Sequence, residues 1–479
     1  MFLQPEFWLL VIGLAVAHHF APRRIQNILL LLASYLVYAL FDFRFLFLLI
    51  AATTLTYGAG LYILRDGSRK RLVFSTAIVI DVGILLYFKY AGFFLESFAS
   101  LLGKFGITLD AKIAALVLPL GLSFYTFRLL SYLFDTYNNR ISTAYSWIDV
   151  ALYTAFFPQI SSGPIERAAK FLPRLQVARR LTVEQVVLGL SFICLGLFYK
   201  ICIADPLASI TDMAFGAVGK LSSAEAFVAM LLYSIRLYGD FAGYSAMAIG
   251  VSTWFALPAM DNFRQPYFSQ SVVEFWTRWH VSLSSWFRDY FFFPLSRSLI
   301  GKFGAKFTFR IQIAVLWLTM LLTGMWHGST LTFAVWGWLH GLYMVTERLI
   351  GQYIPGATAK LPDDALWGNR ARLLGNILIT QLAVAAGWVV FRANSLAEAQ
   401  LFFQRMFSAD YQIAGYWWKT LLTAGVFMLG IDLLQAKAQS LLSFWNIGLG
   451  WRVALLTSII VSLLIFSGGA HATFIYGSF

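Results

Sequence analysis

The chain has 479 residues, of which 59% are hydrophobic, 17% are aromatic and only 12% are charged. Soluble domains carry about 25% charged residues, so a water-soluble fold of this length could not cover so much apolar surface. Apolar runs of the length that crosses a bilayer recur along the whole chain. We therefore predict an all-α, polytopic integral membrane protein with one membrane-embedded domain over residues 1–479.

The net charge of +13 is distributed in short basic clusters between apolar runs rather than along one polar face. This pattern is typical of topology signals and argues against nucleic acid as a partner. The positive-inside rule places the loops around Arg65–Arg71 and Arg167–Arg180 in the cytoplasm, and the N-terminus on the other side. Because the first apolar run has no basic region before it and no cleavage site after it, we expect it to remain as a helix.

In chain order, the apolar runs predict about eleven transmembrane helices plus re-entrant and interfacial helices. The runs lie near residues 7–20, 25–41, 43–64, 72–90, 93–109, 113–135, 148–165, 183–203, 224–256, 311–350, 371–391, 414–435 and 450–467.

Two stretches between these runs do not resemble simple spans. Residues 156–180 contain three prolines and a glycine among charged residues, so a continuous helix is not expected there. Broken backbone at membrane depth survives only against protein or water, which favours a re-entrant loop at the cytoplasmic face. Residues 352–372 are polar and are expected to form an exposed loop.

A third stretch, residues 274–290, carries large side chains at helical spacing. They advance by three or four residues, so one helix would present them as a single stripe opposite its polar residues. Such a helix is expected to lie in the membrane interface. The stripe consists of Trp276, Trp279, Leu283, Trp286 and Tyr290.

Among the six histidines, His327 is the prime candidate for catalysis. It follows the apolar run 313–325 at a depth where ionisable groups are costly and usually functional. The alternative is a core histidine hydrogen-bonded between helices. His280 lies at the border of the aromatic stripe, where an interfacial position would also explain it. His340 lies thirteen residues beyond His327, which on one continuous helix is roughly the opposite face, so a structural role is favoured.

The other polar groups in apolar runs are ambiguous. His18 and His19 lie at an expected helix end, where snorkelling to the interface explains them. Asp240 has Arg236 one helical turn before it, so it is either half of a buried ion pair or a functional carboxylate. Asp81 has the same ambiguity, and His471 is uninformative. No metal is expected, because no ligand spacing is present, and Cys194 and Cys202 give no disulfide framework.

Five blocks follow one another along the chain: LPLGLSFYTFRLLSYLFDTY (118–137), FFPQISSGPIER (156–167), GDFAGYSAMAIG (239–250), NFRQPYFSQSVVEFWTRWHVSLSSWFRDYFFFPL (262–295) and LLTGMWHG (321–328). In this order they resemble the membrane-bound O-acyltransferase family. Two further blocks, GWVVFRANSLAEA (387–399) and FIYGSF (474–479), narrow the resemblance to the bacterial branch that includes the alginate O-acetylation protein and its peptidoglycan and cellulose relatives.

The resemblance implies catalytic roles for His327, in the WHG block, and for His280, in the RWHxSLS block. Neutral imidazole suits removal of a proton from an acceptor hydroxyl, and His280 would orient or donate to the thioester carbonyl. This sequence keeps Asp240 of a third family block but departs at Gly239, Ala242 and Ala246. A carboxylate at position 246 is therefore absent here.

The resemblance further implies a fold with a central funnel or tunnel in the inner membrane of a bacterium. Acetyl-CoA or another acetyl thioester would enter from the cytosol, and the acetyl group would pass to a partner acetyltransferase outside the membrane and the polysaccharide export machinery. Alginate is the expected polysaccharide, with peptidoglycan or cellulose as alternatives. A lipid or protein acyltransferase is a further alternative. A secondary transporter would show inverted repeats, and none is evident.

Overall fold

The computed structural model describes residues 2–65, 67–105, 117–354, 366–438 and 448–466, together with residues 472, 474 and 475. Over these residues the secondary structure is helical, with no strand. The chain forms two compact units, and each is made of two separate stretches. Unit 1 contains Met1–Ile193 and Ser245–Met260, and unit 2 contains Cys194–Tyr244 and Asp261–Phe479.

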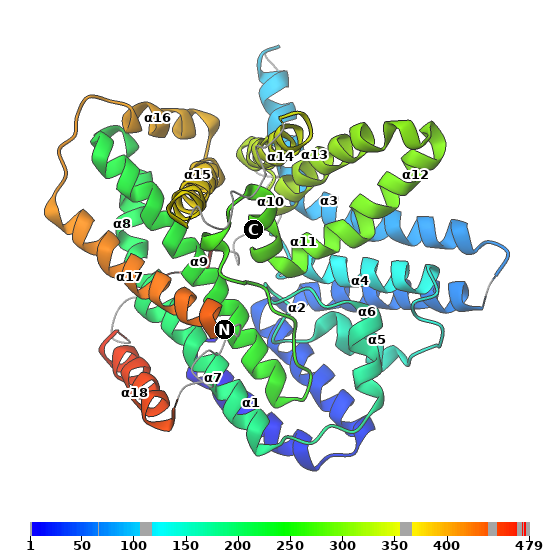
Figure 1. Cartoon of the computed structure of the whole chain (residues 1–479). Coiled ribbons are helices and arrows are strands. Elements are labelled where there is room, and N and C mark those ends of the chain that lie inside the picture. Colours follow the sequence, from blue (N-terminus) through cyan, green and yellow to red (C-terminus); the bar gives the residue numbers. More distant parts are fainter. Residues whose placement is uncertain are drawn as a thin grey trace. The chain divides into compact units, whose positions relative to one another are not determined.

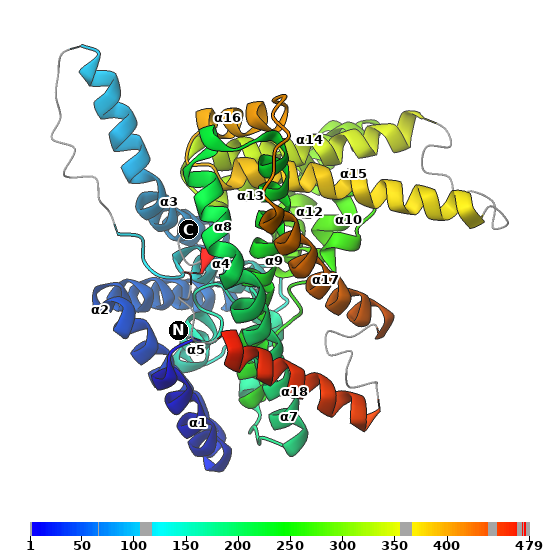
Figure 2. The ribbon, with the colours of Figure 1, turned by 90° about the vertical axis from the view of Figure 1, so that its left-hand side faces the viewer.

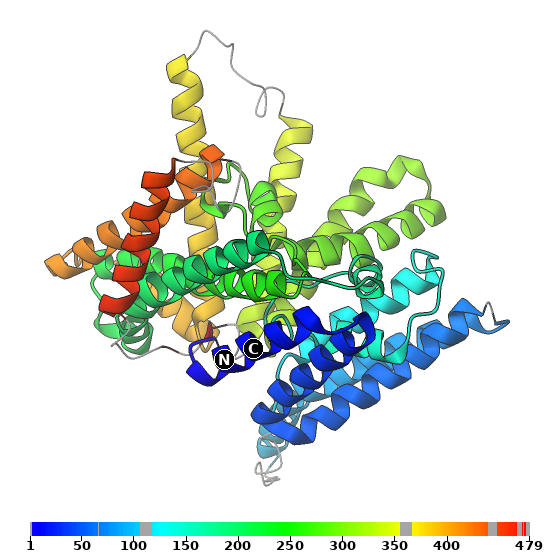
Figure 3. The same ribbon diagram turned by 90° about the horizontal axis from the view of Figure 1, so that it is seen from below.

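Unit 1 is built around the long helix α2, which packs against α3, α4 and α5 (Figures 1 and 3). Non-helical backbone at Asp42, whose carboxylate is bound by Arg44, kinks α2 near its middle. The kink confirms the two predicted runs, 25–41 and 43–64. The helices of this unit are α1 (Pro5–Phe20), α2 (Arg23–Leu64), α3 (Lys70–Gly103), α4 (Leu122–Tyr137), α5 (Trp147–Ala155), α6 (Ala168–Phe171), η2 (Leu172–Gln176) and the first part of α7 (Val183–Leu197).

The proline-rich stretch 156–180 is irregular, as predicted, with only α6 and η2 as short helical turns. Buried polar side chains hold it in place: Arg128 donates to Gln159 Oε1 at 2.9 Å, and Gln159 donates to Ser252 Oγ at 3.2 Å. Arg179 is also buried and donates to Asn27 Oδ1 at 2.6 Å. The basic cluster Arg167–Arg180 therefore contains a buried arginine with a structural role, and not only exposed topology signals.

The two neighbouring histidines of α1 differ in their surroundings. His18 is buried, with its ring 5.5 Å from that of Phe255, so snorkelling to the interface does not describe it. His19 Nδ1 accepts a hydrogen bond from the main-chain N–H of Leu181 at 3.2 Å. Both contacts bind α1 to other parts of unit 1.

Unit 2 contains the α13–α14 hairpin, and α15 packs beside α14 (Figure 2). Residues 355–365, which make up most of the predicted polar loop, lie outside the described residues. The elements of this unit are η3 (Phe198–Ala204), α8 (Asp205–Gly216), η4 (Val218–Lys220), α9 (Ser223–Trp254, whose last turns belong to unit 1), η5 (Pro266–Phe268), α10 (Val272–Arg278), α11 (Val281–Phe287), η6 (Arg288–Phe292), α12 (Phe293–Phe303), η7 (Ala305–Phe307), α13 (Thr308–His327), α14 (Leu331–Tyr353), α15 (Leu366–Arg392), α16 (Leu396–Met406), α17 (Gly415–Ala438) and α18 (Leu449–Phe466).

The prediction of one continuous aromatic helix over 274–290 is wrong. His280 has a left-handed backbone conformation (φ 45°), which ends α10 and starts α11. All five members of the predicted stripe are buried among other side chains of unit 2, with exposed fractions of 5% or less. Buried rings do not serve as interfacial anchors, so these residues form part of the core of unit 2.

Within the described residues, six segments are long and apolar enough to cross a membrane. Helix α2 is about 60 Å long at 1.5 Å per residue, roughly twice the thickness of the hydrocarbon core. The segments are Arg23–Leu64, Lys70–Leu95, Val183–Gly216, Ala305–His327, Asn369–Arg392 and Gly415–Ala436. The chain is thus a multi-pass helical membrane protein.

Candidate active site

His327 is the last residue of α13, and a close approach of two helix backbones fixes its position. Gly324 and Gly337 face each other where α13 packs on α14, and a Cβ added to Gly324 would lie 2.8 Å from the Gly337 Cα. A side chain at either position would separate the helices. The predicted run 311–350 is therefore a hairpin of two helices, with His327 at its turn.

Three aromatic rings surround His327, which is 2% exposed. The centroids of Trp326, Trp336 and Phe391 lie 4.9, 5.2 and 5.3 Å from that of the imidazole, each in an edge-on arrangement. We call these three side chains the aromatic cage. The rings exclude water from three directions and leave few orientations open to the imidazole.

His280 lies at the break between α10 and α11 and is fully buried. Its Nδ1 is 3.0 Å from Asn262 Oδ1, which also accepts from the Ser282 main-chain N–H at 3.2 Å and from Ser282 Oγ at 2.8 Å. A main-chain N–H can only donate, so the shared Asn262 atom is an oxygen. The His280 proton therefore lies on Nδ1, and Nε2 of the neutral ring is an acceptor.

Burial lowers the pKa of His280 to about 3, so its ring is neutral at physiological pH. The expectation that an interfacial helix keeps this histidine in water is therefore wrong. Trp326 connects the two candidates, since its ring lies 6.2 Å from that of His280 and 4.9 Å from that of His327. The rings of His280 and His327 thus both lie near the ring of Trp326.

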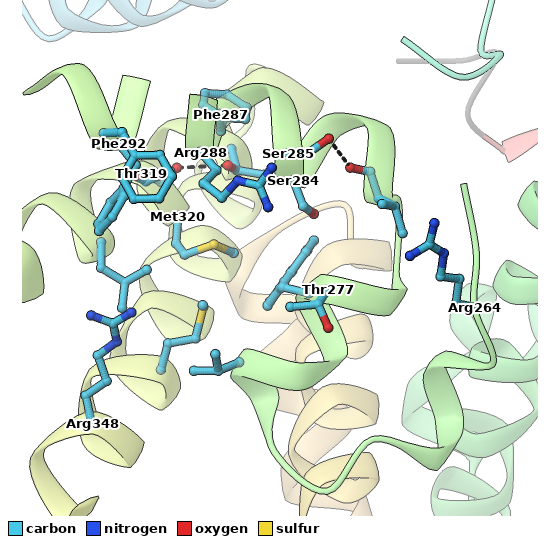
Figure 4. Close-up of a pocket in the computed structure, with 17 residues that line it drawn as sticks. Arg264, Thr277, Ser284, Ser285, Phe287, Arg288, Phe292, Thr319, Met320 and Arg348 are labelled. Atoms are coloured by element: carbon cyan, nitrogen blue, oxygen red, sulfur yellow. Dashed lines mark hydrogen bonds between the residues drawn. The ribbon is translucent and has the colours of Figure 1, made fainter. Parts of the chain in front are cut away.

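A cavity of about 420 Å³, drawn in Figure 4, is lined by residues that lie close in sequence to both candidate histidines. Its wall includes Val281, which follows His280, and Thr323, one helical turn before His327. Arg264, Arg288 and Arg348 line it from three separate segments. We call it the Arg348 cavity. Its wall combines methionine and phenylalanine side chains with serine and threonine hydroxyls, which suits a ligand with an apolar part and an anionic part.

A second cavity of about 420 Å³ reaches the aromatic cage through Phe391. Asp212 binds two arginines on its wall, Arg236 at 2.7 Å and Arg392 at 3.0 Å. Thr330, Asn394 and Ile475 also line it. We call it the Arg392 cavity, and its many polar side chains suit a hydroxylated ligand.

His340 does not lie on the same helix as His327, because the chain turns between α13 and α14. It also packs against Trp336, with the ring centroids 4.9 Å apart, and its Nδ1 accepts from Trp276 Nε1 at 3.3 Å. A Cβ added to Gly387 would lie 2.6 Å from His340 Nε2. These contacts support the structural role that the sequence favoured for His340, although for a different geometric reason.

The intramembrane carboxylates have partners that the sequence did not reveal. Asp240 is bound by Lys200, with 2.8 Å between Nζ and Oδ1, whereas Arg236 is bound to Asp212. The suggested Asp240–Arg236 pair is therefore wrong. Asp81 accepts from Thr56 Oγ1 at 2.8 Å in unit 1, between α2 and α3.

Sequence reasoning missed Lys200, Asn262 and the members of the aromatic cage other than Trp326. Lys200 could have been found, because it is a lone charge within the apolar run 183–203. Nothing in the sequence connects Asn262 to His280, eighteen residues later. His471 lies outside the described residues. In the part of the chain that the structure describes, no three His, Cys, Asp or Glu side chains form a group that could hold a metal ion.

Comparison with known proteins shows the family of the chain. A model of the MBOAT, membrane-bound O-acyltransferase family, matches residues 129–386, which include both candidate histidines. The chain is 37% identical to the probable alginate O-acetylase AlgI of Pseudomonas aeruginosa over 82% of this chain and 71% of that protein. It is 32% identical to the probable alginate O-acetylase AlgI of Pseudomonas putida over 96% of each chain.

A third relative is the peptidoglycan O-acetyltransferase of Helicobacter pylori, 31% identical over 77% of this chain and 71% of that one. Matches of this extent cover the first and the last thirds of the chain as well as its centre. The chain belongs to the membrane-bound O-acyltransferase family and is an acyltransferase.

Proposed function

We propose that this protein transfers acetyl groups from a thioester donor to a hydroxyl acceptor for the O-acetylation of an exported polysaccharide, with His327 as the general base. The observation that carries the proposal is the place of His327 inside the aromatic cage. Phe391 of the cage lines the Arg392 cavity, and Thr323, one helical turn before His327, lines the Arg348 cavity. Alginate is the polysaccharide we favour, from the names of the relatives in Pseudomonas. The Helicobacter relative supports peptidoglycan as the second candidate.

In the reaction, the acceptor oxygen attacks the thioester carbonyl while His327 removes the hydroxyl proton. The tetrahedral oxyanion then collapses, the carbon–sulfur bond breaks, and the proton passes from the imidazolium to the leaving thiolate. The products are an acetyl ester and a free thiol, so no net proton is taken up. His280, with its proton on Nδ1, offers Nε2 only as an acceptor, which argues against donation to the thioester carbonyl through that atom.

The charge distribution of unit 2 suggests which cavity serves which substrate. Lys302, Lys306 and Arg310 precede or begin α13, at the end of the helix opposite to His327. The positive-inside rule places that end in the cytoplasm. Arg348 lies near the end of α14 that pairs with it, so we assign the Arg348 cavity to the cytosolic donor and the Arg392 cavity to the acceptor.

The remaining features of the proposal rest on the family resemblance and on the apolar runs of the sequence. Acetyl-CoA or another acetyl thioester is the donor, and the acetyl group is received by an acetyltransferase partner outside the membrane that works with the export machinery. The protein has about eleven transmembrane helices in a single domain, resides in the inner membrane of a bacterium and forms a tunnel between the two cavities. Membership of an acyltransferase family leaves the transporter alternative without support.

The decisive experiment compares His327→Gln with His340→Gln. Both histidines are buried against Trp336, so the two variants disturb the same core, but only the first removes the proposed base. Glutamine cannot accept a proton at neutral pH, and positioned proton transfer contributes about 10² to 10⁴ in rate. We expect His327→Gln to lose at least about 10² in acetyl transfer per mole of folded protein and to keep donor binding.

His340→Gln is expected to lose activity only as far as it loses folded protein. A His327→Gln variant that keeps more than about a tenth of wild-type turnover contradicts the general-base role. Comparing acetyl, longer-chain and carrier-protein thioesters as donors in the same detergent assay identifies the donor. Turnover with alginate and peptidoglycan fragments identifies the acceptor class.

A further inference from the structure

A buried charged cluster lies in unit 2 apart from both histidines. Lys200, in the π-helical turn η3, is 5% exposed, and its Nζ lies 2.8 Å from one carboxylate oxygen of Asp240 and 2.8 Å from one of Asp205. A lysine in an apolar run of membrane length is costly and usually has a function. The π-helical geometry is also frequent at functional sites.

Two further bonds of this cluster go to a segment that follows α18. Lys200 Nζ donates to the carbonyl of Ala472 at 2.9 Å, and the main-chain N–H of Ile475 donates to the second oxygen of Asp240 at 2.7 Å. The ring of Phe474 stacks on Tyr244, with 4.6 Å between centroids. Lys200 and Asp240 therefore bind the backbone of this segment, and Phe474 adds a side-chain contact.

The same segment reaches the surroundings of the proposed active site. Ile475 lines the Arg392 cavity together with Phe391, a member of the aromatic cage around His327. Phe241, whose ring is 6.2 Å from that of Phe474, is 4.7 Å from the ring of His280. The segment thus shares a cavity with a neighbour of His327 and a ring contact with a neighbour of His280.

The bonding pattern indicates what the charges are for. An ion pair between Lys200 and Asp240 would by itself connect η3 to α9. Here each partner gives one further hydrogen bond to residues 472 and 475, and hydrogen bonds to charged groups are the stronger ones. Lys200 and Asp240 themselves are buried, which strengthens these bonds relative to bonds in water.

We propose that Lys200 and Asp240 are positioning residues that dock the segment around Ala472 and Ile475 against the Arg392 cavity, so that the chain supplies part of the wall that receives the acceptor. The docking itself follows from the contacts above. Only the identification of this cavity with the acceptor rests on the proposed function.

Crosslinking tests the docking without any turnover. Tyr244→Cys and Phe474→Cys are introduced together in full-length protein in which Cys194 and Cys202 are replaced by alanine, and the yield with a short thiol crosslinker is measured. Lys200→Met and Asp240→Asn should lower the yield about tenfold, as expected for the loss of a hydrogen bond to a charged group. Asp432→Asn is the matched control, because Asp432 is an equally buried carboxyl that binds Tyr238 instead.

A change in the backbone tests the docking even where the variants of Lys200 and Asp240 fail to fold. Ile475→Pro removes the main-chain N–H that donates to Asp240, and it leaves Lys200 and both carboxylates in place. Ile475→Ala also removes the isoleucine side chain but keeps the main-chain N–H. With acetyl-CoA as donor and an alginate oligosaccharide as acceptor probe, we expect Ile475→Pro to raise the acceptor KM about tenfold over Ile475→Ala, with the donor KM unchanged.

Unchanged crosslinking in both Lys200→Met and Ile475→Pro would overturn the docking. Equal losses in Ile475→Pro and Ile475→Ala would show that the side chain, and not the bond to Asp240, matters. If an inactive His327→Gln protein crosslinks normally, the docking holds even though the catalytic proposal is tested separately. A rise in the donor KM alone would refute the assignment of the cavity to the acceptor.

Discussion

Replacing Asn262 by alanine removes the single oxygen that three buried donors share, namely His280 Nδ1–H, the Ser282 N–H and the Ser282 Oγ–H. A buried donor without an acceptor costs about 1–3 kcal/mol. The hydroxyl can rotate and the imidazole can move its proton, but the main-chain N–H has no such freedom. We therefore expect the free energy of unfolding to fall by about 3 kcal/mol.

The same change should alter the chemistry of His280. Without Asn262, nothing in this contact holds the proton on Nδ1, so Nε2 is no longer kept as an acceptor. We expect turnover per mole of folded protein to fall about tenfold, the lower end for loss of a partner that fixes a histidine tautomer.

The assay is an unfolding titration in mixed detergent micelles, followed by acetyl transfer on the folded fraction. Ser282→Ala is the control, because it removes one donor and leaves none without an acceptor, so it should cost about 1 kcal/mol or less. The double variant should be less destabilised than the sum of the single variants. If Asn262→Ala unfolds within about 0.5 kcal/mol of wild type, the shared oxygen does not hold the break between α10 and α11.

Three further predictions concern topology, packing and pH. Cysteines introduced in the loops around Arg65–Arg71 and Arg167–Arg180 should be protected from an impermeant thiol reagent added outside intact cells, and labelling of both would reverse the orientation. Trp279→Ala should cost about 3–5 kcal/mol of unfolding free energy, because the ring is 1% exposed, stacks on Phe275 and packs at a tilt against Trp388. A stable variant with weakened membrane binding would restore the interfacial interpretation. The pKa of His280 is lowered from its ordinary value of 6.5 to about 3. Its contribution to stability is therefore present above pH 6.5 and is lost as the pH falls toward 3. Wild type should lose more stability between pH 7 and pH 5 than His280→Gln does.

The helical membrane class and several helix boundaries could be predicted from the sequence because hydrophobic length is a local property. The kink of α2 at Asp42 is an example, since the two apolar runs on either side were evident. Family motifs marked His280 and His327. The partners of these residues could not be predicted, because Asn262, Lys200 and Phe391 reach them through tertiary contacts that leave no periodic signal.

The helical spacing of the large side chains in residues 274–290 gave a wrong prediction, because the backbone of one residue interrupts the helix. The spacing of Trp276, Trp279 and Leu283 fits a continuous helix, yet the left-handed backbone of His280 interrupts it. Residues other than glycine adopt this conformation rarely and at a cost of order 1–3 kcal/mol, commonly at functional positions. In the same way, the spacing of Arg236 and Asp240 suggested a pair along α9, but partners on η3 and α8 bind each of them separately.

The contact between Gly324 and Gly337 also matters for altering the acyl-chain preference of this enzyme. Because two main chains meet there, the register of α13 against α14 does not depend on how the neighbouring side chains fill the Arg348 cavity. Met320 and Met344 line that cavity, and flexible methionines tolerate exchange well. On the proposed assignment of this cavity to the donor, we expect smaller residues at these positions to lengthen the space for propionyl or butyryl groups while His327 stays where the hairpin holds it.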